Sequence, residues 1–349
     1  MSFRRIVNGT EVKSNNIDSN TVNANTVNAE TVSAETVSAN TINATEIYTD
    51  IEFDIFVAVA GNTTTAAYST DGITWTQTTM PATARWRSVT YGDGTFAAVA
   101  YDSSTAAYST DAITWTTTTL PATARWRSVT YGDGTFAAVA SFTSTAAYST
   151  DAITWTQTTL PASDGWRSVT YGDGTFAAVA YNSSTAAYST DAITWTQTTL
   201  PASARWTSVT YGDGTFAAIA TTTTTTAAYS TDGITWTQTT MPATANWTSV
   251  TYGDGTFAAV AYNSSTAAYS TDAITWTTTT LPATARWRSV TYGDGTFAAV
   301  AGSYFGDSTT AAYSTNGITW TQTTLPASVG WQSVTNGETI FNTKINDLL

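Results

Sequence analysis

The side chains able to carry chemistry in this chain of 349 residues are carboxylates and arginines, because it contains no histidine and no cysteine. Nucleophile–base pairs of the usual kinds and soft-metal sites are therefore excluded. The aspartates recur singly in short turns that read Gly-Asp-Gly or Ser-Thr-Asp. Paired carboxylates can hydrolyse glycosides, and oxygen ligands can hold Ca²⁺, but one aspartate per turn favours a structural role. We therefore predict no catalytic residue, no metal ion and no cofactor.

Arginine follows a second recurring pattern, in which it flanks a tryptophan, as in Arg85-Trp86-Arg87. In one interpretation the tryptophan belongs to the core and the arginines are solvated flanks. In the other, guanidinium groups and aromatic rings bind an anionic or carbohydrate ligand. The residues predicted to bind such a ligand are Arg85, Arg87, Arg125, Arg127, Arg167, Arg205, Arg286, Arg288, Tyr101, Phe142, Tyr181, Tyr262, Tyr304 and Phe305.

Both patterns belong to a repeat of about 40 residues, which indicates an array of similar supersecondary units. Its anchor reads Tyr-Ser-Thr-Asp/Asn-Gly/Ala-Ile-Thr-Trp. The seven copies begin at Tyr68, Tyr108, Tyr148, Tyr188, Tyr229, Tyr269 and Tyr313.

Each repeat contains four short runs rich in Val, Thr, Tyr, Phe and Trp, which predict β-strands rather than helices. In the first full repeat they cover 86–91, 95–101, 106–110 and 114–119. The Gly-Asp-Gly and Asp-Gly pairs between them favour tight turns. Pro81 and its six equivalents cannot donate to a strand ladder and are expected to end the last strand of each repeat. Four antiparallel strands in about 40 residues match one blade of a β-propeller.

The two ends of the array complement each other. The first copy begins at 56–60 and lacks the strand that precedes it elsewhere, whereas the last copy ends with an extra strand at 331–335. If the extra strand completes the first blade, the chain forms a closed all-β propeller of seven blades without exposed edges. An open array of hairpins is the alternative.

The repeats vary on one side only. We use the name variable face for the connections at 84–87 and the turns at 101–104, together with their equivalents in the other repeats. All eight arginines between residues 54 and 335 lie there, against Asp102, Asp164 and Asp307. The Gly-Asp-Gly and Ser-Thr-Asp turns are nearly uniform and belong to the opposite side. The sequence predicts one acidic face and one mildly basic face rimmed by aromatic residues.

A different repeat precedes the array: β-branched residues recur every five residues from Val7 to Ile47. This period fits neither a helix nor an alternating strand. We expect identical chains to wind into a homotrimeric stalk; disorder and a pentapeptide-repeat β-helix are the alternatives. The predicted divisions are an attachment and oligomerisation stalk over 1–52, the propeller over 53–335 and a tail over 336–349. Residues 1–16 lack the apolar core of a signal peptide.

The segment from Ser69 to Trp75, Ser-Thr-Asp-Gly-Ile-Thr-Trp, resembles the Asp-box of sialidase-like propellers. The resemblance implies that Asp71, Asp111, Asp151, Asp191, Asp232 and Asp272 brace the turns. It also implies that Trp75, Trp115, Trp155, Trp195, Trp236, Trp276 and Trp320 fill the core. The segment is one residue shorter than the family pattern, and four copies have Ala for Gly. Sialidase activity needs a Tyr–Glu pair, yet no glutamate occurs between Glu52 and Glu338.

The repeats also look like those of bacteriophage tail-fibre and other virion proteins. We therefore expect a non-enzymatic virion fibre or receptor-binding protein that attaches to a host-surface glycan. A structural or decorating virion protein is the alternative, and a glycoside hydrolase a distant third. The expected partners are copies of the chain in a trimer, other virion proteins and a host receptor. The expected location is the virion, assembled in host cytoplasm, or else the extracellular surface. A net charge of −13 disfavours nucleic acid, and no apolar run has membrane-spanning length.

Overall fold

The computed structural model describes residues 6–13, 16–18, 21–33, 36–38, 41–302 and 307–344. The chain divides into two compact units. Unit 1 comprises Met1–Phe53 and Glu338–Leu349, and unit 2 comprises Asp54–Gly337. Side chains are described for residues 54–302 and 307–339, which is unit 2 without the gap at 303–306, plus the two residues that follow unit 2. None of the described residues forms a helix long and apolar enough to cross a bilayer.

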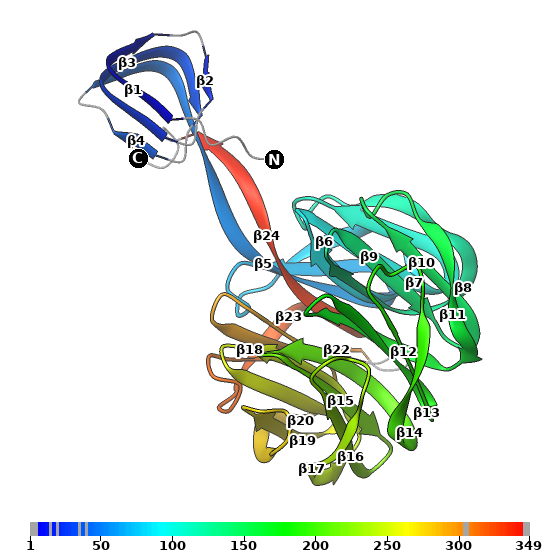
Figure 1. Cartoon of the computed structure of the whole chain (residues 1–349). Helices are drawn as coiled ribbons and strands as arrows, with labels where there is room; N and C mark the ends of the chain where they lie inside the picture. Colours follow the sequence, from blue (N-terminus) through cyan, green and yellow to red (C-terminus); the bar gives the residue numbers. More distant parts are fainter. Residues whose placement is uncertain are drawn as a thin grey trace. The chain divides into compact units, whose positions relative to one another are not determined.

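Unit 1 consists of strands of one chain that pair with one another in parallel (Figure 1). Its strands are β1 (Ile6–Lys13), β2 (Asn16–Asp18), β3 (Thr21–Ser33), β4 (Thr36–Ser38) and the start of β5 (Thr41–Ser69). Ile6 pairs with Thr21, and Thr26 pairs with Thr41, so partners are 15 residues apart. Three of the five-residue repeats therefore complete one turn of the chain.

The 15-residue offset brings β-branched positions into register. Val7 is opposite Val22, which is opposite Val37. The same holds for the series Val12, Val27 and Ile42 and for the series Ile17, Val32 and Ile47. This pairing within one chain is the kind that the β-helix alternative implies. A homotrimer stays a prediction that no contact in the structure tests.

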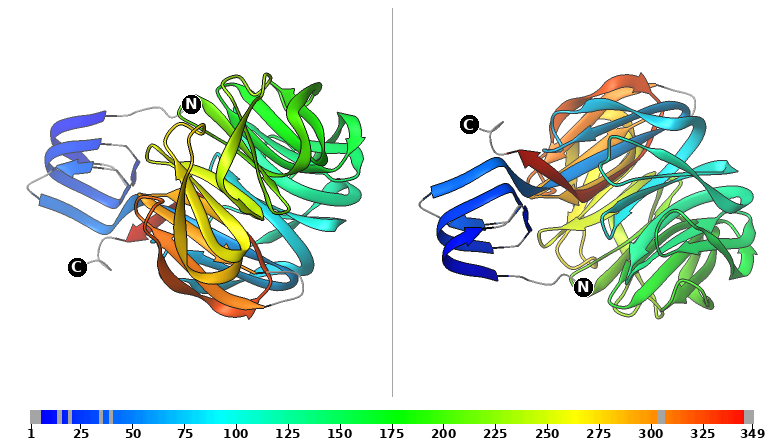
Figure 2. Two further views of the ribbon diagram at one scale, coloured as in Figure 1. Left: turned by 90° about the horizontal axis from the view of Figure 1, so that it is seen from below. Right: turned by 90° about the horizontal axis from the view of Figure 1, so that it is seen from above.

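Unit 2 consists of antiparallel strands that follow one another in sequence (Figure 2). They are the end of β5, β6 (Thr76–Gly92), β7 (Thr95–Ser109), β8 (Thr116–Gly132), β9 (Thr135–Ala140), β10 (Thr143–Ser149), β11 (Thr156–Asp164), β12 (Trp166–Gly172), β13 (Thr175–Ser189), β14 (Thr196–Gly212), β15 (Thr215–Thr221), β16 (Thr224–Ser230), β17 (Thr237–Ala245), β18 (Trp247–Gly253), β19 (Thr256–Ser270), β20 (Thr277–Gly293), β21 (Thr296–Ala301), β22 (Ser308–Ser314), β23 (Thr321–Val329) and the start of β24 (Trp331–Lys344).

The expectation that Pro81 ends a strand is wrong. Strand β6 continues through Pro81: it pairs with β5 both before and after Pro81, and with β7 from Trp86 onward. The ladder to β5 contains Thr79 and then Ala84, so Pro81 lies between paired positions. Its missing N–H therefore removes no ladder hydrogen bond.

The core lies between sheets of successive repeats. Trp86 and Phe96 are fully buried, and one cluster joins them to Val57 of the preceding repeat and Trp115 of the Asp-bearing turn that follows. The strand that begins at Thr95 faces this core on both sides with the run Phe-Ala-Ala-Val-Ala, all of it buried and most of it small. Alanine on both faces lets neighbouring sheets approach closely. Burying each tryptophan contributes roughly 3–5 kcal/mol, judged by what its truncation removes.

The beginning and the end of unit 2 share a core. Phe56 and Trp75 pack in one cluster with Leu325, Trp331 and Val334. Strand β24 pairs with β5, and Figure 2 shows the red segment running beside the blue one. The backbone N–H of Gly61 also donates to the carbonyl of Gly330 at 3.0 Å.

Two series of hydrogen bonds join successive repeats. In the first, a serine hydroxyl accepts from the backbone N–H of a valine in the next repeat, as Ser88 does from Val129 at 3.1 Å. The series has seven members, the last running from Val89 to Ser333. In the second, a threonine hydroxyl donates to an isoleucine carbonyl; it also has seven members and ends with Thr323 and Ile73.

Candidate functional site

Trp86, Trp126, Trp166, Trp206, Trp247, Trp287 and Trp331 are fully buried, and we call them the inner tryptophans. In the six repeats whose strand register is described, the residue after the inner tryptophan occupies a β-bulge. Trp86 pairs with Ala100 and Ser88 with Val99, so Arg87 is the extra residue between them. A bulge turns the side chain of its extra residue away from the regular alternation of the strand. We use the name bulge ring for this position in all seven repeats: Arg87, Arg127, Arg167, Thr207, Thr248, Arg288 and Gln332.

The arginines of the bulge ring act on one another electrostatically. Burial lowers the pKa of Arg167 well below its ordinary value, and the positive charges of Arg127, Arg87 and Arg288 lower it further. Tyr181 opposes the shift. The side chain of Arg167 keeps some accessible surface, so its surroundings are crowded and not sealed. Like charges from three other repeats therefore act on Arg167.

The uncharged members of the bulge ring bond to their neighbours. Gln332 accepts at Oε1 from Nη1 of Arg87 at 3.0 Å, across the junction between the two ends of unit 2. Thr207 donates its hydroxyl to the carbonyl of Trp247 at 3.0 Å, and Thr248 does the same to that of Trp287 at 2.9 Å. The chain itself thus shows that threonine fits this position.

Tyrosines of the variable face lie under the guanidinium groups. The Cζ atoms of Arg85 and Arg127 are 4.6 and 4.3 Å from the centroid of the Tyr101 ring. Nη2 of Arg127 donates to the Tyr101 hydroxyl at 3.2 Å. Tyr181 lies 5.1 Å from Arg167 and 5.6 Å from Arg205 in the same way. Each of these tyrosines has a bulge-ring arginine and an outer arginine near its ring.

We use the name connection arginines for the outer set, Arg85, Arg125, Arg205 and Arg286. Three of them are exposed, and Arg85 is half-buried. Asp102 accepts from Nη1 of Arg85 at 2.8 Å and from Nε of Arg125 at 3.3 Å. Exposed ion pairs of this kind add little to stability.

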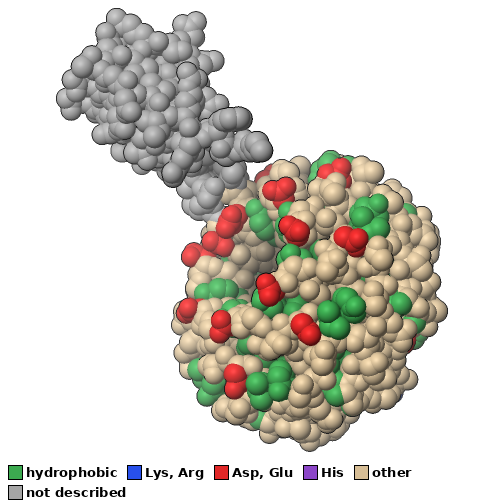
Figure 3. All heavy atoms as spheres, in the orientation of Figure 1, with side chains coloured by type: hydrophobic (Ala, Val, Ile, Leu, Met, Phe, Trp, Pro, Cys, Tyr) green, Lys and Arg blue, Asp and Glu red, His purple; other side chains and the backbone are tan. Residues whose placement is uncertain are grey.

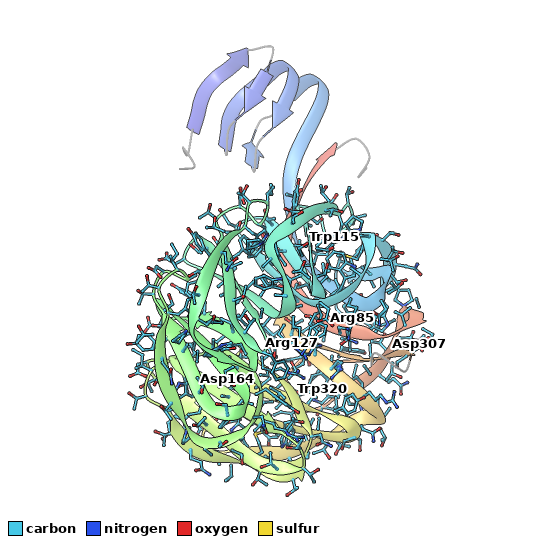
Figure 4. All side chains as sticks on the ribbon, turned by 90° about the vertical axis from the view of Figure 1, so that its right-hand side faces the viewer. Arg85, Trp115, Arg127, Asp164, Asp307 and Trp320 are labelled. Atoms are coloured by element: carbon cyan, nitrogen blue, oxygen red, sulfur yellow. The ribbon has the colours of Figure 1, made fainter. Side chains whose placement is uncertain are left out.

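Figure 4 shows the bulge-ring residue Arg127 near the middle of unit 2 and Asp307 at its edge.

The remaining aromatic candidates differ in position. Tyr262 lies 5.2 Å from Arg288. Phe142 is 58% exposed and lies 5.6 Å from Arg125, beside a shallow hollow of about 400 Å³. A similar hollow of about 490 Å³ is lined by Arg205 and a run of threonines. Tyr304 and Phe305 lie outside the described residues.

The aspartates of the opposite side hold turns. Oδ1 of Asp111 accepts from the backbone N–H groups of Ile113 and Thr114 at 2.8 and 2.7 Å, and from the Ser109 hydroxyl at 2.9 Å. Partial burial would raise the pKa of Asp111, but these hydrogen bonds outweigh it and the pKa is lowered. Asp71, Asp151, Asp191, Asp232 and Asp272 make the same contacts.

The four alanines that replace glycine in these turns adopt the same left-handed backbone. Ala112 has φ of 64° and Gly72 has φ of 68°. In the alanine copies the tryptophan indole donates to the alanine carbonyl, as Trp115 does to Ala112 at 3.0 Å. In two glycine copies, those of Trp75 and Trp236, the indole nitrogen makes no hydrogen bond to the described protein. In the third glycine copy the Trp320 indole donates to the Gly317 carbonyl at 3.2 Å, so the bond does not depend on alanine.

Charge is separated between the two sides of unit 2. Figure 3 shows a face with several Asp or Glu side chains and no visible Lys or Arg. Along β6, the arginines stand before Ser88, and Asp93 follows the far end of the strand. Among the described residues, no three His, Cys, Asp or Glu side chains gather closely enough to hold a metal ion.

The sequence did not separate the eight arginines into two sets. The structure brings Arg87, Arg127, Arg167 and Arg288 together and leaves the connection arginines farther out. It also adds Thr207, Thr248 and Gln332, which were not predicted, to the same ring. The signal was their shared place after the inner tryptophan in every repeat.

No protein-family model matches this chain, and a search of curated proteins finds no match. Solved structures do resemble it. Virginiamycin B lyase from Staphylococcus aureus has a TM-score of 0.62 at 15% identity, with 69% of this chain and 85% of that chain covered. A streptogramin B lyase has a TM-score of 0.62 at 12% identity, covering 78% and 88%. YCF48 bound to D1 peptide has a TM-score of 0.55 at 15% identity, covering 70% and 82%. The chain therefore has a β-propeller repeat fold.

The comparison contradicts the function expected from the sequence. The solved structures that resemble this chain include virginiamycin B lyase, which is an enzyme, and none of the three named above is described as a virion fibre, a receptor-binding protein or a glycoside hydrolase. The expectation rested on the amino-acid sequence of the repeats. That sequence reflects how the fold packs, and one fold serves many functions.

Proposed function

We propose that residues 54–337 form a closed seven-bladed β-propeller that serves as a non-enzymatic module for binding an anionic ligand. The blade count is supported by the two series of hydrogen bonds, each of which has seven members and returns to its starting repeat. The shared cluster of Phe56 and Trp331 supports closure by the C-terminal strand. We also propose that the Ser-Thr-Asp turns are Asp-box turns of the sialidase-like type.

The absence of catalysis is proposed from the residue types. One structure of the Staphylococcus aureus lyase is of a catalytically inactive variant in which a histidine is replaced by alanine. The present chain has no histidine, and no glutamate occurs between Glu52 and Glu338. Six aspartates of the turns each accept two backbone hydrogen bonds at Oδ1, which gives these carboxylates a structural role. A scaffold of this kind suits binding better than proton transfer.

The anionic ligand is proposed from one observation. All eight arginines of the propeller lie on the variable face, and the positive charges of three of them act on a fourth, Arg167. Guanidinium groups recognise carboxylate and phosphate with two hydrogen bonds each. Tyr101, Tyr181 and Tyr262 hold the arginine side chains and limit their conformational freedom.

The test is a binding survey with the full chain. We expect phosphate, sulfate, citrate or pyrophosphate to raise the melting temperature at constant ionic strength, relative to chloride. The acidic-face variant Asp133→Asn should respond as the wild type does. If none of the anions raises the melting temperature, or if cleavage of a streptogramin is detected, the proposed function is wrong.

A further inference from the structure

We propose that Arg87, Arg127, Arg167 and Arg288 bind one polyvalent oxyanion of the phosphoryl class, with pyrophosphate as its simplest member, inside the bulge ring. This inference rests on the proposed function and deepens it, because it names the ligand class and places it on the inner set of arginines. The connection arginines then contribute only a weaker, screened attraction.

The geometry that points to one ligand is the short circuit of inner strands. Ser88, next to Arg87, bonds to the neighbouring inner strand at 3.1 Å, and each of the other six repeats makes the equivalent contact. The seven links form a closed circuit, because the series returns from Ser333 to Val89. Arg87, Arg127, Arg167 and Arg288 stand on four strands of this circuit, each next to a linking serine, and the charges of the other three act on Arg167.

The bulge supports a role in binding. It aims the side chains of the ring independently of the core tryptophans, so the ring can change without disturbing the packing. The chain uses this freedom, since threonine and glutamine stand at three of the seven positions and no acid stands at any. The four arginines repel one another, and a bound anion offsets this repulsion by its own negative charge. An anion with several charges is therefore favoured over a monovalent one.

Two side chains give a matched pair for the test, because Arg167 and Arg205 both lie against the ring of Tyr181. Arg167 belongs to the bulge ring, and Thr207 and Thr248 show that threonine fits there. Arg205 is a connection arginine, and Asn246 holds the equivalent place in the next repeat. Arg167→Thr and Arg205→Asn each remove one positive charge, the first from the bulge ring and the second from the connection arginines.

The experiment is calorimetric titration of the full chain with inorganic pyrophosphate at constant ionic strength. Arg167→Thr should weaken binding about tenfold or more, as expected for a lost charge-assisted hydrogen bond, and Arg205→Asn less than about threefold. Thr207→Arg should strengthen binding. Without ligand, Arg167→Thr should have an unchanged or higher melting temperature at low salt, since one of four like charges is gone; a purely structural arginine would lower it.

The outcomes separate the inference from the proposed function. If the wild type binds anions but Arg205→Asn weakens pyrophosphate as much as Arg167→Thr, the ligand lies on the outer face and only the inference is wrong. Tighter binding of citrate than of pyrophosphate would overturn the phosphoryl class. Binding of no anion at all contradicts the proposed function itself. Should Arg167→Thr fold poorly, Arg127→Thr and Thr207→Arg decide between the same alternatives.

Discussion

The aspartates of the turns show how one carboxylate links local structure to pH. The pKa of Asp111 is lowered by hydrogen bonds from Thr114, Ile113 and Ser109, which outweigh the opposing effect of partial burial. A carboxylate with a lowered folded-state pKa stabilises the protein above its unfolded pKa of about 3.9. That stabilisation disappears as the pH falls through the folded-state pKa. Asn316 makes the same backbone contacts without a titrating group, at 2.9 Å to Ile318 and Thr319.

We therefore predict that Asp111→Asn lowers the free energy of unfolding at pH 7 by about 1 kcal/mol or less, because solvent screens this partly exposed group. Replacing all six turn aspartates by asparagine should reduce the loss of stability between pH 7 and pH 3. Urea unfolding at both pH values measures this. Asp133→Asn, in a Gly-Asp-Gly turn, controls for net charge. An equal acid-induced loss in the wild type and the sixfold variant would contradict the assignment.

Close approach of neighbouring sheets depends on glycines that accept an aromatic ring. A Cβ added at Gly172 would stand 2.0 Å from Cγ of Tyr211 in the next repeat. Gly92, Gly132, Gly212 and Gly253 have the same relation to the following tyrosine, and in one repeat Asn336 takes the place of the tyrosine against Gly293. The spacing of the sheets is thus set by contacts between elements and not by turn geometry alone.

Gly172→Ala should destabilise unit 2 by about 3 kcal/mol or more, since backbone and ring must both move. Gly174→Ala is its matched control: it adds the same methyl group at φ of 76° with no atom within 4 Å. There only the strain of the left-handed conformation applies, about 1–2 kcal/mol. Chemical denaturation of the two variants gives the comparison. Equal destabilisation would show that the tyrosine contact is not limiting.

Much of this element structure is predictable from the sequence, and the rest is not, for identifiable reasons. The runs that begin at Trp86 and Thr95 are rich in residues that favour strands and are separated by Gly-Asp-Gly, so strands and turns follow from local preference. The bulge at Arg87 leaves no such mark, because it depends on how Trp86 fits the next sheet. Partners 15 residues apart in unit 1 could not be inferred, since a five-residue period suits pairing within a chain as well as between chains. The continuation of β6 through Pro81 likewise depends on the partner strands.

A short C-terminal segment, Trp331 to Ser333, contacts the first repeats of unit 2. Trp331 is fully buried in the cluster that contains Phe56. Gln332 accepts from Arg87, and the Ser333 hydroxyl accepts from the Val89 N–H at 3.3 Å. These contacts join residues more than 240 positions apart. An array closed in this way gains stability that an open array of the same repeats would lack, because its two terminal sheets cover each other.

Removal of residues 331–349 should therefore lower the free energy of unfolding by several kcal/mol or abolish soluble expression, as expected when a buried tryptophan and an edge-covering strand are lost together. Removal of 338–349 is the control, because it leaves Trp331 and its contacts in unit 2 intact. Thermal unfolding of both truncated chains, followed by tryptophan fluorescence, separates the two effects. Trp331→Ala should reproduce most of the loss without shortening the chain. If all three proteins melt at the temperature of the full chain, the C-terminal strand does not close the propeller, and the proposal of seven blades has to be replaced by an open array.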